Sequence, residues 1–213
     1  ESCEELLLDQ DVMESVYKLF EEHGADIWFE KETDELETLV TELLSLARIE
    51  SGQFHLEKQK TDMAKLLRQV VRDANFEGEQ KGCSVNLHAV EAFSLEVDPV
   101  LIRSAVENVI RNAIRYSPEQ GLVEVSTLLD ADSFQIIIED SGPGVPESEL
   151  DKLFQPFARV AEARDRLSGG FGLGLAITGK SLLAHKGQAR AENRSAGGLR
   201  VILSLPLEAG KSN

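Results

Sequence analysis

Apolar residues recur at intervals of three and four in two stretches near the start of the chain, residues 6–20 and residues 36–49. This period is typical of amphipathic helices, and residues 23–26 hold a glycine that would separate the two. The pattern therefore predicts a helical hairpin over residues 1–53. Two helices cannot bury both apolar faces alone, so we expect the hairpin to form a four-helix bundle with a second copy or to pack on the rest of the chain.

Short alternating patterns and longer helical patterns follow one another in the remainder of the chain. Alternation of apolar and polar residues predicts strands over residues 54–58, 84–87, 93–97, 123–129, 134–139, 188–193 and 199–205. Helical periodicity predicts helices over residues 62–81, 99–116 and 173–185. A sheet of four or five mainly antiparallel strands with three helices is an α+β fold, a two-layer α/β sandwich. We assign it to residues 54–208, after the hairpin and before a short tail at residues 209–213.

Two acidic residues mark the predicted starts of helices in this region. Asp62 and Asp98 each precede an apolar helical pattern, and aspartate at that position accepts hydrogen bonds from free backbone N–H groups. Pro99 directly follows Asp98, and proline suits the first helical position because no N–H is needed there.

The overall charge and composition narrow the classes of function. The 213 residues are 42% hydrophobic and 28% charged, which is ordinary for a globular domain, and the formal net charge is −16. Such a chain is not expected to bind nucleic acid, because that binding needs clustered lysine and arginine. The two cysteines, Cys3 and Cys83, predict neither a disulfide framework nor a zinc site. No apolar run is long enough to span a membrane, and no signal peptide is recognisable.

The helix predicted over residues 99–116 carries polar side chains among its apolar ones. Asn108 and Asn112 are four residues apart and therefore lie on the same face. Their amide oxygens are suitable ligands for Mg²⁺. Arg115 could pair with phosphate oxygens, and Tyr116 offers a flat surface for a base. The alternative is that these residues form only the exposed side of an amphipathic helix.

Two glycine-rich stretches follow this helix in the sequence. Asp140 is followed by Gly142 and Gly144. The second stretch, just before an apolar helix, consists of Gly170, Phe171, Gly172, Leu173 and Gly174. Glycine lets the backbone approach a ligand closely, a helix N-terminus presents free N–H groups to an anion, and a carboxylate can accept from a base edge. Each stretch alone would be read as a turn, but together they predict a nucleotide site.

Four segments of this region resemble, in their order, the motifs of sensor histidine kinases. Residues 108–117 are similar to the N box of that family, residues 140–144 to the G1 box, residues 153–157 to the F box and residues 170–177 to the G2 box. The wider superfamily also contains gyrase, Hsp90 and MutL ATPases, and Tyr116 together with the F box is typical of the kinase branch. The resemblance implies the α/β sandwich of histidine-kinase ATPase domains, with ATP and Mg²⁺ as cofactors.

The resemblance also implies a role for each matching residue. Asn112 would coordinate Mg²⁺ beside the ATP phosphates with Asn108 in support, and Glu107 would position a water bound to the metal. Arg115 and Tyr116 would contact the nucleotide next to them. The carboxylate of the G1 box would accept a hydrogen bond from the adenine amine.

The glycines of both stretches would let the backbone approach ATP, at the base after Asp140 and at the phosphates before the last helix. Residues 145–171 between them would form an ATP lid. Three arginines of the lid could approach the γ-phosphate or remain in solvent; they are Arg159, Arg164 and Arg166. Phe171 departs from the family pattern, which has a small polar residue there, and its ring could narrow the phosphate site.

The family's phospho-acceptor motif is not recognisable. That motif is a histidine followed by glutamate and, a few residues on, proline. This chain has no proline before Pro99, and its one early histidine, His23, does not match. Residues 32–53 do resemble the second helix of the family's dimerisation and phosphotransfer domain. The remaining histidines are expected at surface or structural positions and are His55, His88 and His185.

The resemblance implies the cytoplasmic catalytic part of a two-component sensor histidine kinase from a bacterial inner membrane. It would bind Mg-ATP and transfer the γ-phosphoryl group to a histidine for relay to a response regulator. Its partners would be ATP, the response regulator and a second copy bound through the N-terminal helices, and it would reach the membrane only through segments outside this chain. The missing acceptor motif and Phe171 leave two alternatives, a nucleotide-binding regulatory module without phosphotransfer and an ATPase of the gyrase or MutL type.

Overall fold

The computed structural model describes residues 25–50, 55–158 and 171–207. The chain divides into two compact units, Glu1–Thr41 and Glu42–Asn213. Helix α2 (Ala25–Glu50) begins within the predicted break and covers the second predicted helix. The first predicted helix, residues 6–20, lies outside the described residues, so the hairpin over residues 1–53 stays a prediction.

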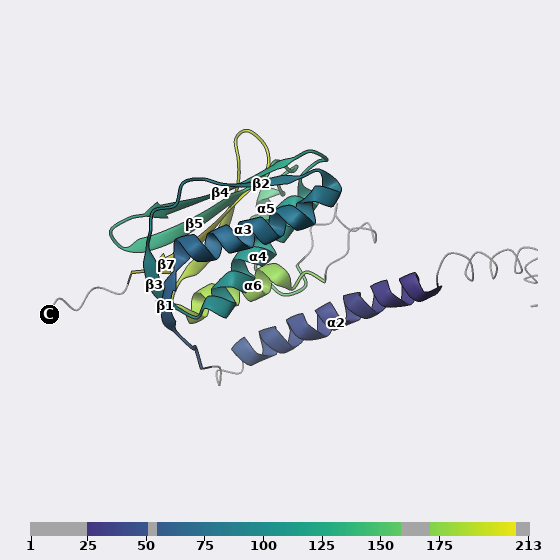
Figure 1. Ribbon diagram of the computed structural model, residues 1–213, viewed down its shortest axis with the longest axis horizontal. Coiled ribbons are helices and arrows are strands. Elements are labelled where there is room, and N and C mark those ends of the chain that lie inside the picture. Colours follow the sequence, from purple (N-terminus) through teal and green to yellow (C-terminus); the bar gives the residue numbers. More distant parts are fainter. Residues whose placement is uncertain (1–24, 51–54, 159–170, 208–213) are drawn as a thin grey trace, which may run out of the picture. The chain divides into compact units, whose positions relative to one another are not determined.

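The second unit is built on a five-stranded sheet. The strand order is β2 (Ser84–Leu87), β4 (Leu122–Leu129), β5 (Ser133–Glu139), β7 (Leu199–Pro206) and β6 (Gln188–Asn193). β2 runs parallel to β4, and the other neighbouring pairs are antiparallel. Three helices, α3 (Met63–Gly78), α4 (Pro99–Tyr116) and α6 (Gly174–Ala184), lie together on one face of the sheet (Figure 1). This arrangement confirms the predicted α+β two-layer sandwich.

A separate two-stranded antiparallel sheet joins β1 (Gln59–Asp62) to β3 (Ser94–Val97). The strand predicted over residues 54–58 is wrong in its position, because the strand begins at Gln59. Gln59 pairs with Val97, the last residue of β3, so β3 offers no partner to the residues before it. A strand needs a partner for its N–H and C=O groups, and an alternating side-chain pattern does not supply one.

The predicted helix starts are confirmed. The Asp62 carboxylate accepts a hydrogen bond at 2.9 Å from the backbone N–H three residues later. The Asp98 carboxylate accepts from the N–H groups of Val100 at 3.1 Å and Leu101 at 3.3 Å. Pro99 is the first residue of α4, as its missing N–H allows. Each of the two aspartates therefore caps the N-terminus of the helix that follows it.

Helix α3 ends earlier than the predicted residue 81. It stops at Gly78, and one turn of 3-10 helix, η1 (Glu79–Lys81), leads to the next strand. A Cβ atom at Gly78 would lie 2.5 Å from the carbonyl oxygen of Cys83, so the chain can turn this tightly only with glycine. A further short helix, α5 (Glu147–Leu150), follows β5 and its loop.

The hydrophobic core lies between the five-stranded sheet and the three helices. Alternate residues of β5, namely Phe134, Ile136 and Ile138, are buried beneath the helices. Helix α4 adds a buried stripe that includes Ile102, Val106, Val109 and Ile110. Burial of each large apolar side chain is worth roughly 1.5–3 kcal/mol, so this layer holds α4 firmly on the sheet. Within the described part of the chain no helix is both long and apolar enough to cross a bilayer.

Candidate nucleotide-binding site

One row of α4 faces the start of α6. Asn108, Asn112 and Tyr116 follow one another at intervals of four and so share this row. The Asn108 side chain donates a hydrogen bond from Nδ2 to the carbonyl oxygen of Gly174 at 3.2 Å. A Cβ atom at Gly174 would lie 3.3 Å from Cγ of Asn108, so a larger residue there would press on the amide. The first residue of α6 and the predicted N box therefore meet directly.

Asn112 lies one turn further along the same row and is half-buried. Its side chain makes no hydrogen bond with any residue that the structure describes. A half-buried amide without a protein partner is available to a ligand, and its oxygen is a hard donor of the kind that Mg²⁺ takes. The described residues contain no group of three His, Cys, Asp or Glu side chains able to hold a metal. The residues present therefore fit an ion held mainly by phosphate and an amide oxygen.

Asp140 lies at the end of β5 and is buried. One carboxylate oxygen, Oδ1, accepts from the N–H of Gly142 at 2.8 Å and from that of Leu199 at 3.1 Å. The other oxygen has no hydrogen-bond partner among the described residues. Burial raises the pKa of Asp140, and the two backbone hydrogen bonds and the charge of Arg194 partly offset this effect. One oxygen is thus fixed by the protein and the other is free to accept from a ligand.

Gly142 connects Asp140 with the end of α4. A Cβ atom at Gly142 would lie 2.8 Å from the carbonyl oxygen of Tyr116, so the loop after β5 can pass the helix this closely only with glycine. Tyr116 itself is 45% exposed, and the Arg115 guanidinium lies 5.9 Å from the centre of its ring. The backbone of Tyr116 therefore borders the loop of Asp140, and its exposed ring has a cation beside it.

Asn193, the last residue of β6, and Arg194, directly after it, complete the surroundings of Asp140, and neither is among the residues predicted from the sequence. Arg194 donates from Nη1 to the carbonyl oxygen of Asp140 at 2.6 Å. Asn193 clamps the loop that follows Gly144, because its Oδ1 accepts from Val145 N at 2.9 Å and its Nδ2 donates to Val145 O at 2.7 Å. Gly144 has φ +75°, a conformation that favours glycine. The adjacent Gly197-Gly198 pair was the one sequence signal that could have indicated this close approach.

Lys81 is another contributor that the sequence analysis missed. Its ammonium group donates to the carbonyl oxygens of Ile114 at 2.9 Å and Arg115 at 2.6 Å, and also to that of Ser117. These are the unpaired carbonyls at the end of α4, where the helix dipole favours a cation. Lys81 therefore holds in place the last turn of α4, which carries Arg115 and Tyr116.

The two described ends of the predicted lid meet beside α6. The N–H of Phe157 donates to the carbonyl oxygen of Gly172 at 3.0 Å. Gly172 has φ +75°, and a Cβ atom there would lie 2.9 Å from the carbonyl oxygen of Ala158. Phe154 packs against Gly179 of α6, where an added Cβ would lie 3.3 Å from it. The predicted F box thus anchors the lid to the helix that begins at the phosphate site.

The remaining predicted residues of the second glycine stretch differ in how deeply they are buried and in whether the structure describes them. Phe171 is half-buried. Leu173 is fully buried in the protein, so only its backbone could reach a ligand. Gly170 lies outside the described residues, as do the lid arginines Arg159, Arg164 and Arg166.

Glu107 lies on a different row of α4 from the two asparagines. Its carboxylate pairs with Arg103 Nε at 2.6 Å, and the Nη2 of Arg103 also pairs with Asp73 of α3 at 2.6 Å. On the same side Arg111 pairs with Glu77 of α3 at 3.3 Å. Glu107 is therefore engaged by Arg103 on the side of α4 whose arginines pair with α3, and no hydrogen bond among the described residues joins it to Asn112. Its predicted role with a metal-bound water stays a prediction.

The family of the chain follows from this fold and from a direct comparison. Residues 97–209 match the family described as histidine kinase-, DNA gyrase B- and HSP90-like ATPases. The match covers more than half of the chain, from the cap of α4 to beyond β7, and the chain belongs to this family.

Among individual proteins the chain is similar to sensor kinases. It is 37% identical over 179 residues to the sensor histidine kinase CpxA of Escherichia coli (strain K12), which is 84% of this chain and 38% of that protein. It is 36% identical over 172 residues to the sensor protein CutS of Streptomyces coelicolor, which is 80% of this chain and 41% of that protein. The chain therefore spans about two-fifths of the length of these curated relatives.

Solved structures agree with this family. The mycobacterial sensor histidine kinase MprB has a TM-score of 0.63 and 28% identity, over 70% of this chain and 97% of that one. The Acinetobacter baumannii histidine kinase AdeS has a TM-score of 0.71 over 93% of this chain and 94% of that one, and at 22% identity it supports the fold alone. The predicted resemblance to sensor histidine kinases is confirmed.

Proposed function

We propose that the chain is the ATP-binding catalytic part of a two-component sensor histidine kinase. The observation that carries the proposal is that three groups follow one another along α4: the half-bonded Asp140 carboxylate, whose Gly142 lies against Tyr116 O; the Asn112 amide, which has no hydrogen-bond partner among the described residues; and the first turn of α6, which Asn108 contacts. These groups suit, in turn, an adenine amine, a phosphate-bound cation and phosphate oxygens. The free oxygen of Asp140 accepts from the adenine amine, and guanine is disfavoured because it presents an oxygen at that position.

The phosphates lie between α4 and the start of α6 in this proposal. Asn112 would hold Mg²⁺ with Asn108 beside it, and the ion would supply positive charge to the phosphates. The backbone N–H groups of Gly172 and Gly174 and the Arg115 guanidinium would bind phosphate oxygens. Their close approach requires glycine, as the contacts of Gly174 with Asn108 illustrate.

The γ-phosphoryl group passes to a histidine in an acceptor motif of the family type, which none of the described histidines His55, His88 and His185 matches. His185 is unsuitable because both ring nitrogens are engaged, Nε2 with Asp98 N and Nδ1 with Ser181 O. His88 pairs with Glu124 at 3.2 Å on the surface. The acceptor then belongs to a helical bundle formed by two copies through their N-terminal helices. From there the phosphoryl group is relayed to an aspartate of a response regulator, on the cytoplasmic side of an inner membrane.

The test combines ATP binding with phosphate transfer. The purified chain is titrated with ATP and with GTP, with and without Mg²⁺, and is then mixed with radiolabelled Mg-ATP and the separately purified dimerisation bundle of the same kinase. We expect Mg²⁺-dependent binding selective for ATP and an acid-labile, base-stable label on the bundle. Tight binding without any label would identify a regulatory module instead, which the bulky Phe171 favours. Continuous phosphate release without label would identify an ATPase.

A further inference from the structure

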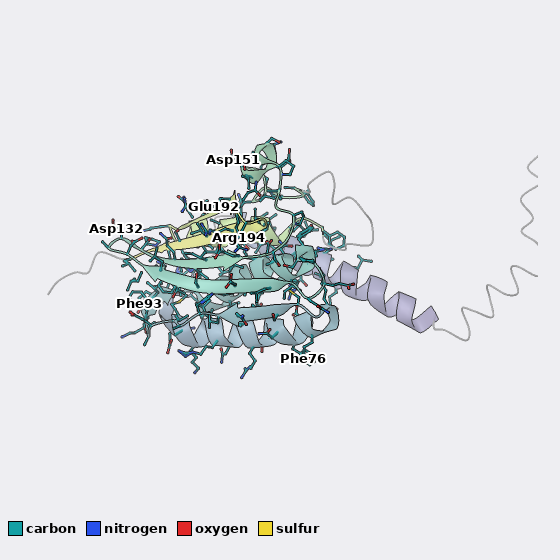
Figure 2. All side chains as sticks on the ribbon, turned by 90° about the horizontal axis from the view of Figure 1, so that it is seen from above. Phe76, Phe93, Asp132, Asp151, Glu192 and Arg194 are labelled. Carbon is teal, nitrogen blue, oxygen red and sulfur yellow. The ribbon has the colours of Figure 1, made fainter. Side chains whose placement is uncertain are left out.

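One face of α3 points away from α4 and from the ATP site. Arg68, Arg72, Phe76 and Glu79 recur at intervals of four, four and three and therefore share this face. Phe76 is 77% exposed, more than any other large apolar side chain of the described residues. Figure 2 shows it on the outer side of α3, well separated from Arg194, which adjoins the buried carboxylate of the ATP site.

A groove of about 570 Å³ lies beside Phe76. The buried Val71 and the half-buried Leu87 line it together with the exposed Arg68 and Arg72. The groove therefore combines an apolar surface with two guanidinium groups. A surface of this kind suits a ligand that is apolar at one point and negatively charged at another.

The two arginines of the groove have few partners among the described residues, although the net charge of the chain is −16. Arg68 makes no ion pair or hydrogen bond with any residue that the structure describes. Arg72 has a single ion pair, with Asp73 at 3.7 Å, between side chains that are 76% and 50% exposed. Such exposed pairs are worth at most about 1 kcal/mol, so a carboxylate of a partner can replace this one at little cost. By contrast, Arg103 is held by two short ion pairs.

The groove borders the edge strand β2, but the backbone of β2 is already hydrogen-bonded where Asn75 meets it. Asn75 occupies that edge at Val85, because its Nδ2 donates to Val85 O at 2.7 Å and its Oδ1 accepts from Val85 N at 2.8 Å. An open strand edge would pair with the backbone of another chain. Because Asn75 occupies this position, we expect the side chains that line the groove to hold a ligand there.

We propose that this groove docks an acidic segment of a partner protein. One large apolar side chain of the segment packs on Phe76, Val71 and Leu87, and its carboxylates pair with Arg68 and Arg72. Glu79, at the opposite end of the groove from Arg68, repels carboxylates and so sets the direction of the segment. The docking is independent of ATP, because the groove and the nucleotide site share no residue.

A synthetic peptide tests the proposal. Its sequence is a run of glutamates before a leucine and a phenylalanine, and its binding to the chain is followed by fluorescence anisotropy at low and high salt. We expect saturable, salt-sensitive binding that weakens at least about tenfold when glutamines replace the glutamates, since charge-assisted hydrogen bonds are worth about 1.5–3 kcal/mol. Replacing the apolar pair of the peptide with serines should weaken it similarly.

Variants of the chain separate this site from any other acidic-peptide site. Arg68→Ala with Arg72→Ala, and separately Phe76→Ser, should each weaken the peptide at least about tenfold while ATP binding is unchanged. Arg190→Ala is the matched control, because Arg190 is also exposed but lies on β6. Absence of saturable binding, equal binding of the glutamine peptide, or equal affinity in the groove variants would each overturn the proposal. So would a concentration-dependent dimer that Phe76→Ser abolishes, since a second copy would then occupy the groove.

Discussion

Asp140 combines burial with a carboxylate that the backbone binds at one oxygen only. Its pKa is raised above the ordinary value because burial disfavours the charged form. In the free protein this carboxyl group favours folding most when protonated, and that contribution is lost as the pH rises through the raised pKa. The proposed binding of adenine has the opposite dependence: Oδ1 already accepts two N–H groups, so a proton would sit on the outer oxygen and its O–H would face the amine.

ATP affinity should therefore fall on acidification, starting above the pH at which an ordinary aspartate titrates. Below the raised pKa the dissociation constant should rise about tenfold per pH unit, as expected for one linked proton. Calorimetric titrations over a pH series measure this slope. Asp140→Asn is the control, since it keeps the titration of ATP itself and removes that of the carboxylate. An identical slope in the variant would exclude Asp140 as the base-binding group.

Asn112 is the residue on which the proposed metal site depends. Asn112→Ala should weaken ATP binding at least about tenfold in Mg²⁺, because it removes a hard oxygen ligand, and should leave binding in EDTA unchanged. The fold should survive, since the side chain is only half-buried. Asn86→Ala, on the exposed side of β2, is the matched control. Equal losses with and without Mg²⁺ would mean that the amide contacts the nucleotide directly.

At the scale of elements, the start of β7 and the end of β5 are tied together by a glycine. Gly198 has φ +93°, and a Cβ atom there would overlap the carbonyl oxygen of Asp140. Its neighbour Gly197 has φ +89°, but a Cβ atom there would meet nothing within 4 Å. A comparison of substitutions at the two glycines therefore distinguishes backbone strain, which both would have, from steric overlap, which only Gly198 would have.

Gly198→Ala should destabilise the protein more than Gly197→Ala and should also weaken ATP binding. Both variants carry the cost of a positive φ, about 1–3 kcal/mol. Only Gly198→Ala also displaces Asp140. Urea unfolding and ATP titration of both variants measure the two effects. If the two variants behave alike, the contact between Gly198 and Asp140 does not shape the site.

Helix α6 is tied to the start of α4 by a buried histidine. Nε2 of His185 accepts from Asp98 N at 2.9 Å, so Nδ1 carries the proton and donates to Ser181 O at 2.7 Å. Burial lowers the pKa of His185, the charge of Lys58 lowers it further, and Ser181 and Asp98 oppose the shift. Protonation would place an N–H against the Asp98 N–H and break this link.

Stability should accordingly depend on His185 in mildly acidic solution. With a lowered folded pKa, its contribution is full above the unfolded pKa of about 6.5 and is lost as the pH falls through the folded value. His185→Leu should cost about 1–3 kcal/mol at neutral pH, because the Asp98 N–H loses its acceptor, and should flatten the decline on acidification. Urea unfolding at several pH values measures both. His88→Gln, at an exposed position, is the control for the loss of a histidine.

At the scale of the whole molecule, what the sequence predicts is mostly what is local. The faces of α4, the caps at Asp62 and Asp98, and the Asp140 loop depend on short spacings, and the structure has them as predicted. The contributions of Lys81 and Arg194 depend on packing between segments far apart in the chain, so no local pattern reveals them. The ion pair of Arg103 with Asp73 depends likewise on how α3 packs on α4, whereas the pair of Arg103 with Glu107 spans one turn of α4 and follows from a four-residue spacing.

The two backbone amides that bind Asp140 have a further consequence. The N–H groups of Gly142, in the loop after β5, and of Leu199, at the start of β7, donate to the same carboxylate oxygen. Their proton chemical shifts should move together as that carboxyl group loses its proton. A nuclear magnetic resonance titration of the ligand-free chain can therefore read the ionisation of the Asp140 carboxyl group from one glycine and one leucine signal, without any nucleotide present.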